Sequence, residues 1–159
     1  MKIIRNKRIK GMSLIEVMLA VLILAISVVG ASGYRYYSTL DARRADMQAT
    51  AARIGMLLCE NWRGANGSES WDAAGHLGSQ LTMSPIEYPP QRLGFTDFTT
   101  LGAYTVTVDG INYYTGLCWK DVSTGLRALN VVVTWSQRDT GGTIYDADKL
   151  FKLTTYVTN

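Results

Sequence analysis

An apolar run close to the N-terminus is the feature that most constrains this chain. From Met12 to Ala31 the sequence reads MSLIEVMLAVLILAISVVGA, and Glu16 is the only charged residue in these 20 positions. Such a run in an α-helix rises about 30 Å, which matches the hydrocarbon core of a bilayer. The run therefore predicts a helix that can span a membrane.

The charges before the run predict its orientation. Five of the 16 basic residues precede it and no acidic residue does, the five being Lys2, Arg5, Lys7, Arg8 and Lys10. Because basic residues beside a span stay cytoplasmic, we expect residues 1–11 inside and everything after the helix outside the cytoplasm. The remaining 11 basic and 13 acidic residues are scattered. No basic stripe results, so nucleic acid is not an expected partner.

Three interpretations of the run compete. A secretory signal peptide would be removed near Ala31-Ser32-Gly33, but its apolar core usually has about 7 to 15 residues, and a carboxylate inside it disfavours insertion. A plain single-pass anchor accounts for the length and leaves Glu16 unexplained. The third interpretation accounts for both features.

That third interpretation comes from the run Lys10-Gly11-Met12-Ser13-Leu14-Ile15-Glu16-Val17. It closely resembles the class III signal of the type IV pilin superfamily, in which a short basic leader ends in Gly before a Ser/Thr-Leu-Ile-Glu sequence opens the apolar helix. The likeness covers roughly residues 7–33. It implies cleavage after Gly11 by a prepilin peptidase, N-methylation of the new Met12 amine, and retention of the helix.

Glu16 acquires a role within that resemblance. The charged amine of Met12 is costly to bury among packed apolar helices unless an opposite charge neutralises it. The resemblance implies that Glu16 of a neighbouring subunit supplies that charge. The alternative for Glu16 is a carboxylate solvated near the headgroups, since it lies in the first turns of the span.

The helical pattern continues beyond the apolar run. Apolar residues recur at steps of three, four or seven and draw one face of an amphipathic helix, namely Tyr37, Leu40, Met47, Ala51, Ile54 and Leu58. We expect one helix from about Met12 to Arg63, stopped by Gly64, Asn66 and Gly67, with local melting or a bend allowed at Gly30 and Gly33. The expected parts are a leader (1–11), a membrane and filament-core helix (12–33) and a head (34–159).

The last third of the chain predicts a sheet. Alternating patterns indicate four antiparallel strands, at 103–108, 111–119, 127–136 and 149–158, with hairpin turns at Asp109-Gly110 and at 139–142. Residues 65–102 show no sustained period and are expected to be loop with short elements. The apolar face of the sheet needs a partner, and the amphipathic half of the helix is available. The predicted class is α+β, a pilin-like long helix on an antiparallel sheet.

The two cysteines leave two alternatives open. Outside the cytoplasm Cys59 and Cys118 can oxidise, and a bridge closing about 60 residues would stabilise by roughly 4 kcal/mol. Against a bridge, strand alternation turns Cys118 away from the face of Leu117, unless Gly116 marks a bulge. The alternative is two separate thiols.

Catalytic patterns are not evident in the sequence. His76 is the single histidine, which leaves no partner pattern for a His-dependent metal site or a catalytic triad and favours a loop residue. The four tryptophans, Trp62, Trp71, Trp119 and Trp135, are expected to pack in the core or on the sheet. We therefore expect no enzyme activity, no metal site and no cofactor.

The expected function is that of a structural minor pilin in a type IV pilus or pilus-like filament. The strand at 127–135, a Gly-containing turn and a Thr-rich last strand look more like PilV-type minor pilins or minor pseudopilins than a major pilin. The resemblance implies as partners a prepilin peptidase/N-methyltransferase, other pilin-like subunits, an inner-membrane assembly platform and membrane lipid. It implies a single-pass inner-membrane protein that later enters a pilus or pseudopilus. The alternatives are a minor pseudopilin of a type II secretion or DNA-uptake system, and a membrane-anchored or secreted binding domain that forms no filament.

Overall fold

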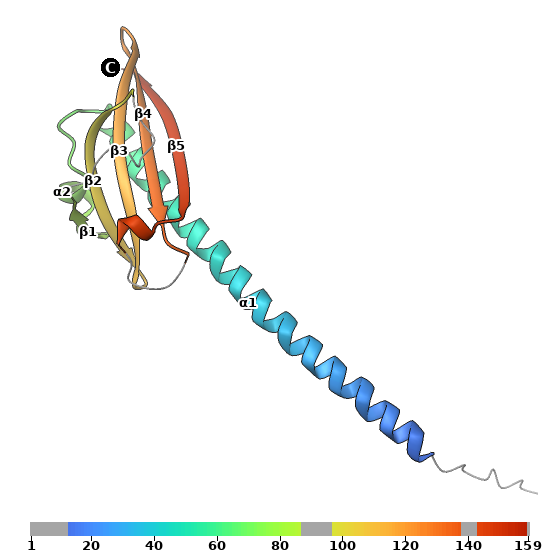
Figure 1. Ribbon diagram of the computed structural model, residues 1–159. Helices are drawn as coiled ribbons and strands as arrows, with labels where there is room; N and C mark the ends of the chain where they lie inside the picture. Colours follow the sequence, from blue (N-terminus) through green and yellow to red (C-terminus); the bar gives the residue numbers. More distant parts are fainter. Residues whose placement is uncertain (1–12, 87–96, 138–142, 159) are drawn as a thin grey trace, which may run out of the picture. The chain divides into compact units, whose positions relative to one another are not determined.

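The computed structural model describes residues 13–86, 97–137 and 143–158. The chain divides into two compact units, residues 1–43 and 44–159. Helix α1 (Leu14–Gly64) contributes to both units, and all other elements belong to the second. These are α2 (Ala73–Leu77), β1 (Thr82–Pro85), β2 (Thr99–Val108), β3 (Ile111–Ser123), β4 (Leu126–Trp135), the short 3-10 helix η2 (Ile144–Asp146) and β5 (Lys149–Thr158) (Figure 1).

Helix α1 has nearly the predicted bounds and passes through Gly30 and Gly33 without interruption, so no local melting occurs there. Its buried residues in the second unit recur at helical spacing, as the amphipathic pattern predicts. They are Met47, Ala51, Ile54, Gly55, Leu58, Cys59 and Trp62. The predicted face does not reach as far back as Tyr37, whose side chain is exposed. The core-facing stripe therefore begins near Met47.

The end of α1 is set by a left-handed residue pair, as expected. Asn66 and Gly67 both have positive φ, 53° and 64°. The amide of Gly67 donates to the Trp62 carbonyl at 3.0 Å and that of Asn66 to the Arg63 carbonyl at 3.0 Å. These two bonds form a Schellman motif, which satisfies carbonyls at the end of a helix.

The sheet is an antiparallel meander with the strand order β1-β2-β3-β4-β5. The turn predicted at Asp109-Gly110 is present, because both residues have positive φ, as a type I′ hairpin requires. The turn predicted at 139–142 lies outside the described residues. Five strands form where about four were predicted, and β2 and β3 are longer than expected. The added strand, β1, has four residues and ends on Pro85. So short a strand leaves no periodic signal in the sequence.

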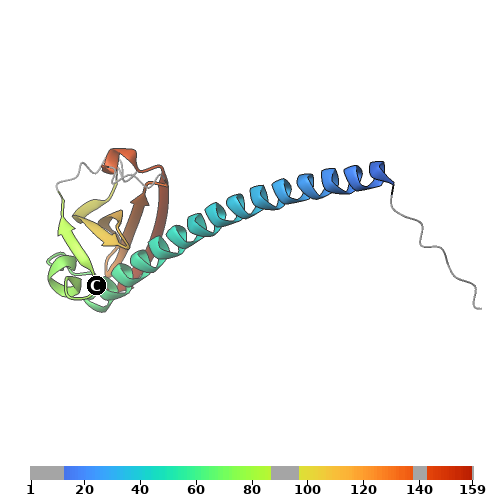
Figure 2. The same cartoon turned by 90° about the horizontal axis from the view of Figure 1, so that it is seen from below.

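The core lies between α1 and one face of the sheet, and in Figure 2 the last turns of α1 run along that side. Leu129, Val131, Val133 and Trp135 of β4 are buried there, and Phe151, Leu153 and Val157 of β5 pack with them. The apolar face of the sheet thus packs on the amphipathic half of the helix, as predicted. Each fully buried Leu or Val contributes about 1.5–3 kcal/mol, so this alternation accounts for much of the stability of the head.

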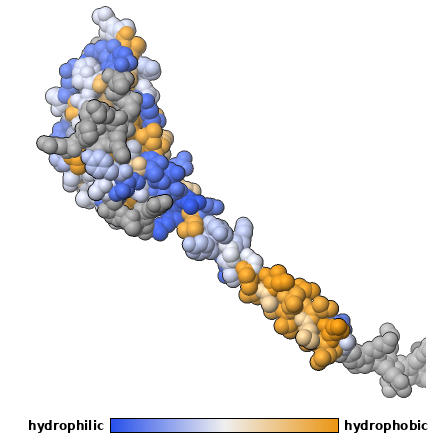
Figure 3. Space-filling view, in the orientation of Figure 1, coloured by the Kyte–Doolittle hydropathy of each residue, from blue (hydrophilic) through white to orange (hydrophobic). Residues whose placement is uncertain are grey.

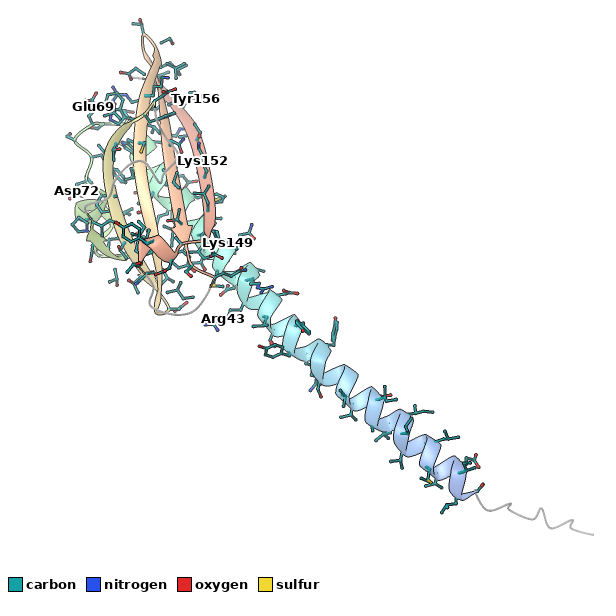
Figure 4. The ribbon with its side chains drawn as sticks, in the orientation of Figure 1. Arg43, Glu69, Asp72, Lys149, Lys152 and Tyr156 are labelled. Carbon is teal, nitrogen blue, oxygen red and sulfur yellow. The ribbon has the colours of Figure 1, made fainter. Side chains whose placement is uncertain are left out.

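The two edges of the sheet carry features that discourage pairing with a further strand. β1 is short and has Pro85, which has no amide hydrogen to donate. β5 carries Lys149 and Lys152, seen along this strand in Figure 4. Charged side chains on an edge strand oppose edge-to-edge association.

Gly67 occupies a position where an Ala side chain would be strained and overpacked. A Cβ there would lie 2.8 Å from Val157 Cγ1 and 3.0 Å from Leu129 Cδ2, on a residue with φ +64°. We predict that Gly67→Ala lowers the free energy of unfolding by about 2–4 kcal/mol, the cost of a left-handed Ala plus overpacking. Urea unfolding of the detergent-solubilised chain measures it.

Gly110→Ala is the matched control. Its φ is +77°, and a Cβ there meets nothing within 4 Å. Gly110→Ala should lower the free energy of unfolding only by the cost of a left-handed Ala, about 1–2 kcal/mol. Equal losses in the two variants would contradict the packing role assigned to Gly67.

Candidate functional site

The candidate functional site is the part of α1 that lies in the first unit. The helix begins at Leu14, and the Ser13 carbonyl accepts the amides of Glu16 at 3.0 Å and Val17 at 3.2 Å. Glu16 lies in the first turn, exposed, where a carboxylate interacts favourably with the positive end of the helix dipole. The predicted cleavage and methylation residues, Gly11 and Met12, lie outside the described residues.

The first turns of α1 present an apolar surface on every side. Twelve large apolar side chains between Leu14 and Val29 are exposed. Figure 3 shows this band over the N-terminal part of the helix. The helix is long and apolar enough to cross a membrane, and none of its most apolar stretch is buried within the chain. A surface of this size needs a cover, and the described part of the chain does not supply one.

Two serines of α1, Ser27 and Ser32, have their hydroxyls satisfied inside the helix. The Ser27 hydroxyl donates to the Ile23 carbonyl and the Ser32 hydroxyl to the Val28 carbonyl, both at 2.8 Å. A hydroxyl bonded to the carbonyl four residues before it needs no water. These serines are therefore compatible with a lipid or helix-packed environment.

The structure does not bring the two cysteines together. Cys59 lies on α1 and is buried in the core, whereas Cys118 of β3 is buried with Val132 on the opposite face of the sheet. The pairing register of β3 has no bulge at Gly116; the register shifts lie at 100–102 and 121–123. Leu117 and Cys118 therefore point to opposite faces of the sheet. Both cysteines are free, so of the two alternatives the structure has the separate thiols. Burial raises the pKa of each thiol.

His76 and the tryptophans have packing roles. Trp62, Trp71 and Trp135 are buried, and Trp119 packs partly buried against the core, as predicted. The exposed His76 lies on α2 rather than in a loop, with its ring stacked 6.1 Å from that of Trp71. Within residues 13–86, 97–137 and 143–158, no three His, Cys, Asp or Glu side chains cluster as metal ligands.

Arg127 forms an ionic cluster that the sequence did not predict, in which a buried guanidinium binds two carboxylates that are 58% (Glu69) and 54% (Asp121) exposed. Its side chain is only 5% exposed, its Nε donates to Asp121 Oδ1 at 2.7 Å, and its Nη2 donates to Glu69 Oε1 at 2.8 Å. Its Nη1 donates to the Gly67 carbonyl at 3.1 Å, and its Cζ lies 4.0 Å from the centre of a Trp119 ring. A buried cation is costly unless it is paired in this way.

The cluster connects the segment after α1 to the hairpin of β3 and β4. Glu69, labelled in Figure 4, comes from the segment after the helix, and Asp121 comes from the end of β3. A signal for the cluster was present, because the alternation of β4 places Arg127 on the same face as Leu129. An inward-facing charge in an apolar strand predicts buried partners. Which carboxylates they are depends on the tertiary fold.

One family model matches the chain. Residues 6–32 match the prokaryotic N-terminal methylation motif. No curated protein and no solved structure gives a significant match. The matched segment includes Gly11, Met12 and Glu16 and most of the exposed apolar surface.

The ionic cluster predicts an acid-sensitive fold. The hydrogen bond from Arg127 holds the pKa of the Asp121 carboxyl below its ordinary 3.8. A carboxyl with a lower pKa in the folded state stabilises the fold above its unfolded pKa. That contribution is lost as the pH falls from 3.8 through the lowered folded value. Urea unfolding between pH 7 and pH 2 should show the loss as a fall in the free energy of unfolding at low pH, the acid limb of the stability curve. Asp121→Asn should make this acid limb less steep.

Asp97→Asn is the control for this prediction. The Asp97 carboxylate is 75% exposed and lies 4.0 Å from Lys120 Nζ. An exposed pair of that kind contributes little, so its acid limb should match that of the unsubstituted chain. If Asp121→Asn also retains the full acid limb, the Arg127 cluster is not its source.

Proposed function

We propose, from the type IV pilin-like methylation motif at residues 6–32, that this protein is a structural minor pilin. A prepilin peptidase cleaves after Gly11 and methylates the Met12 amine. The processed chain stays in the inner membrane through α1 and is then assembled with other pilin-like subunits into a type IV pilus or pilus-like filament. The observation that carries this proposal is the coincidence of the motif with an exposed apolar helix.

The exposed surface supports both stages. In the membrane, lipid tails cover the large apolar side chains between Leu14 and Val29; in a filament, the same side chains of neighbouring helices cover one another. Each such side chain gains about 1.5–3 kcal/mol when it leaves water. Transfer from lipid to helix bundle thus exchanges one apolar environment for another, which lets a single segment serve as anchor and as packing surface.

Glu16 gives the packing a defined register. It follows Met12 by four residues, which corresponds to about 6 Å along a helix axis. A neighbouring helix displaced by that distance places its Glu16 level with the Met12 amine. Pairing the two ions removes the cost of burying either one alone, so subunits joined in this register are favoured over others.

The head supports a structural role. Its buried arginine is bonded to Asp121, Glu69 and a backbone carbonyl, which stabilises the fold. The likeness of its last two strands to PilV-type minor pilins and minor pseudopilins favours a minor subunit. A minor pseudopilin of a type II secretion or DNA-uptake system shares this chemistry and differs in its partners. Co-purification of the neighbouring subunits distinguishes the two.

Glu16→Gln tests the charge pairing. It keeps the size of the side chain and removes its charge, leaving the Met12 amine without a neutralising partner. We expect normal processing and membrane insertion and a loss of at least about tenfold in filament incorporation, since an unpaired buried ion costs several kcal/mol. Immunoblots of sheared filaments and membranes measure both. Glu60→Gln, at an exposed carboxylate of the same helix, should leave both unchanged.

Gly11→Trp separates processing from packing. A bulky residue at the cleavage junction should block removal of residues 1–11 and thereby prevent incorporation. Gly33→Trp makes the same change where a side chain meets nothing within 4 Å, and it should be processed normally. Normal incorporation of Glu16→Gln would refute the pairing, and processing of Gly11→Trp would refute the assigned junction.

A further inference from the structure

Three tyrosines directly follow the apolar run. Tyr34, Tyr36 and Tyr37 are 76%, 63% and 68% exposed, and Arg35 lies among them. The rings of Tyr36 and Tyr37 meet edge to face, with centroids 5.7 Å apart. None of the three belongs to the core of the head. We define Tyr34, Tyr36 and Tyr37 as the tyrosine cluster.

The position of the tyrosine cluster fits the far boundary of a bilayer. Tyr34 lies 20 residues after Leu14, where α1 begins. At 1.5 Å per residue the two are about 30 Å apart along the helix, which is the thickness of the hydrocarbon core. A span that starts at Leu14 therefore ends at the first tyrosine.

The distribution of the rings around the helix favours lipid over a single protein partner. Successive residues turn by about 100° in an α-helix. Tyr34 and Tyr37 therefore project towards neighbouring directions, and Tyr36 projects to the other side. A face that packs on one partner would repeat at steps of three or four, as the buried stripe from Met47 to Leu58 does. Lipid headgroups surround a helix on all sides and can receive every ring.

The chemistry of the cluster also suits the headgroup layer. A tyrosine ring is apolar and its hydroxyl is polar, and such rings are enriched where the hydrocarbon core meets water. Arg35 can extend its guanidinium to lipid phosphates while its methylenes stay in the apolar region. The Thr39 hydroxyl donates to the Tyr36 carbonyl at 2.8 Å, so the backbone here keeps its bonds.

We propose that Tyr34, Tyr36 and Tyr37 bind the phospholipid headgroup layer on the side of the membrane opposite residues 1–11. There they fix the depth of α1 before assembly. This inference rests on the proposed membrane-anchored stage and adds a lipid-binding surface to it. Its energetic basis is that moving the cluster inwards buries three hydroxyls, whereas moving it outwards exposes three rings.

Cysteine accessibility in vesicles tests the proposal. The full chain is reconstituted into phosphatidylethanolamine and phosphatidylglycerol vesicles, with one added cysteine at Val29, Gly33 or Ser38, and treated with a membrane-impermeant maleimide. The unsubstituted chain is the blank, because its two thiols are buried. Thr158→Cys, at an exposed position of β5, reports the share of heads that face outwards. We expect protection at Val29, slow labelling at Gly33 and fast labelling at Ser38.

Three replacements of the whole cluster should move the boundary between protected and labelled positions in different ways. Replacing all three tyrosines by Trp should leave the boundary in place, because Trp also has an apolar ring and a polar group. Replacement by Leu should draw the helix inwards by about one turn and protect Ser38→Cys, whereas replacement by Ala should expose Gly33→Cys. The Leu and Trp variants keep the segment apolar, so the test does not depend on insertion of the Ala variant.

The outcomes separate this inference from the proposed function. A boundary that is the same in the Tyr, Leu and Ala chains overturns the headgroup role. If the labelling boundary is unchanged and the Leu variant no longer enters filaments, the tyrosines act in helix packing. That outcome also overturns the headgroup role. Failure of the unsubstituted chain to float with vesicles would instead contradict the membrane-anchored stage itself.

Discussion

The apolar surface of residues 14–29 is the constraint on which the rest of the molecule depends. Twelve large apolar side chains stand exposed on all sides of one helix, and among residues 13–86, 97–137 and 143–158 no second layer covers them. Water is therefore an unsuitable environment for this segment, and lipid or other helices must surround it. Its serines bond to the backbone of their own helix, so they place no further demand on that environment. In the proposed function, the basic leader sets the orientation of this segment and Glu16 sets its register against neighbouring helices.

The same helix changes character along its length. Up to Val29 it is apolar on every side, at residues 34–37 it carries tyrosines and one arginine, and from Met47 onwards it buries a single stripe against the sheet. The residues of this stripe recur every three or four positions along the helix. They pack against side chains that recur every second position along β4 and β5. The Schellman motif at Asn66 and Gly67 ends the helix, and the Arg127 guanidinium donates to the carbonyl of Gly67. Helix end, ionic cluster and strand packing thus meet at Gly67, where there is no space for a Cβ.

Features with strong local signals were predictable from sequence. The methylation motif, the long helix and its end, the Asp109-Gly110 turn and the inner face of β4 each depend on a few neighbouring residues. β1 was missed because four residues ending in proline have no period, and its pairing with β2 is a tertiary effect. Tyr37 fitted the helical stripe by spacing alone but lies before the part of α1 that the core covers. Compartment and loop length allowed a disulfide and strand alternation opposed it, and in the structure the alternation of β3 keeps the two thiols on opposite faces of the sheet. Asp121 lies directly across the β3-β4 hairpin from Arg127, whereas Glu69 is 58 residues away in the sequence, and no local pattern reveals that pairing.

In the proposed function, this helix is processed at its start and then used whole. The intact mass and N-terminal sequence of the chain recovered from sheared filaments and from membranes test this. We expect the chain in both fractions to begin at Met12, to carry one methyl group on its amine and to retain the complete apolar helix. A chain that begins near Tyr34, or one that still carries residues 1–11 in the filament, would contradict it.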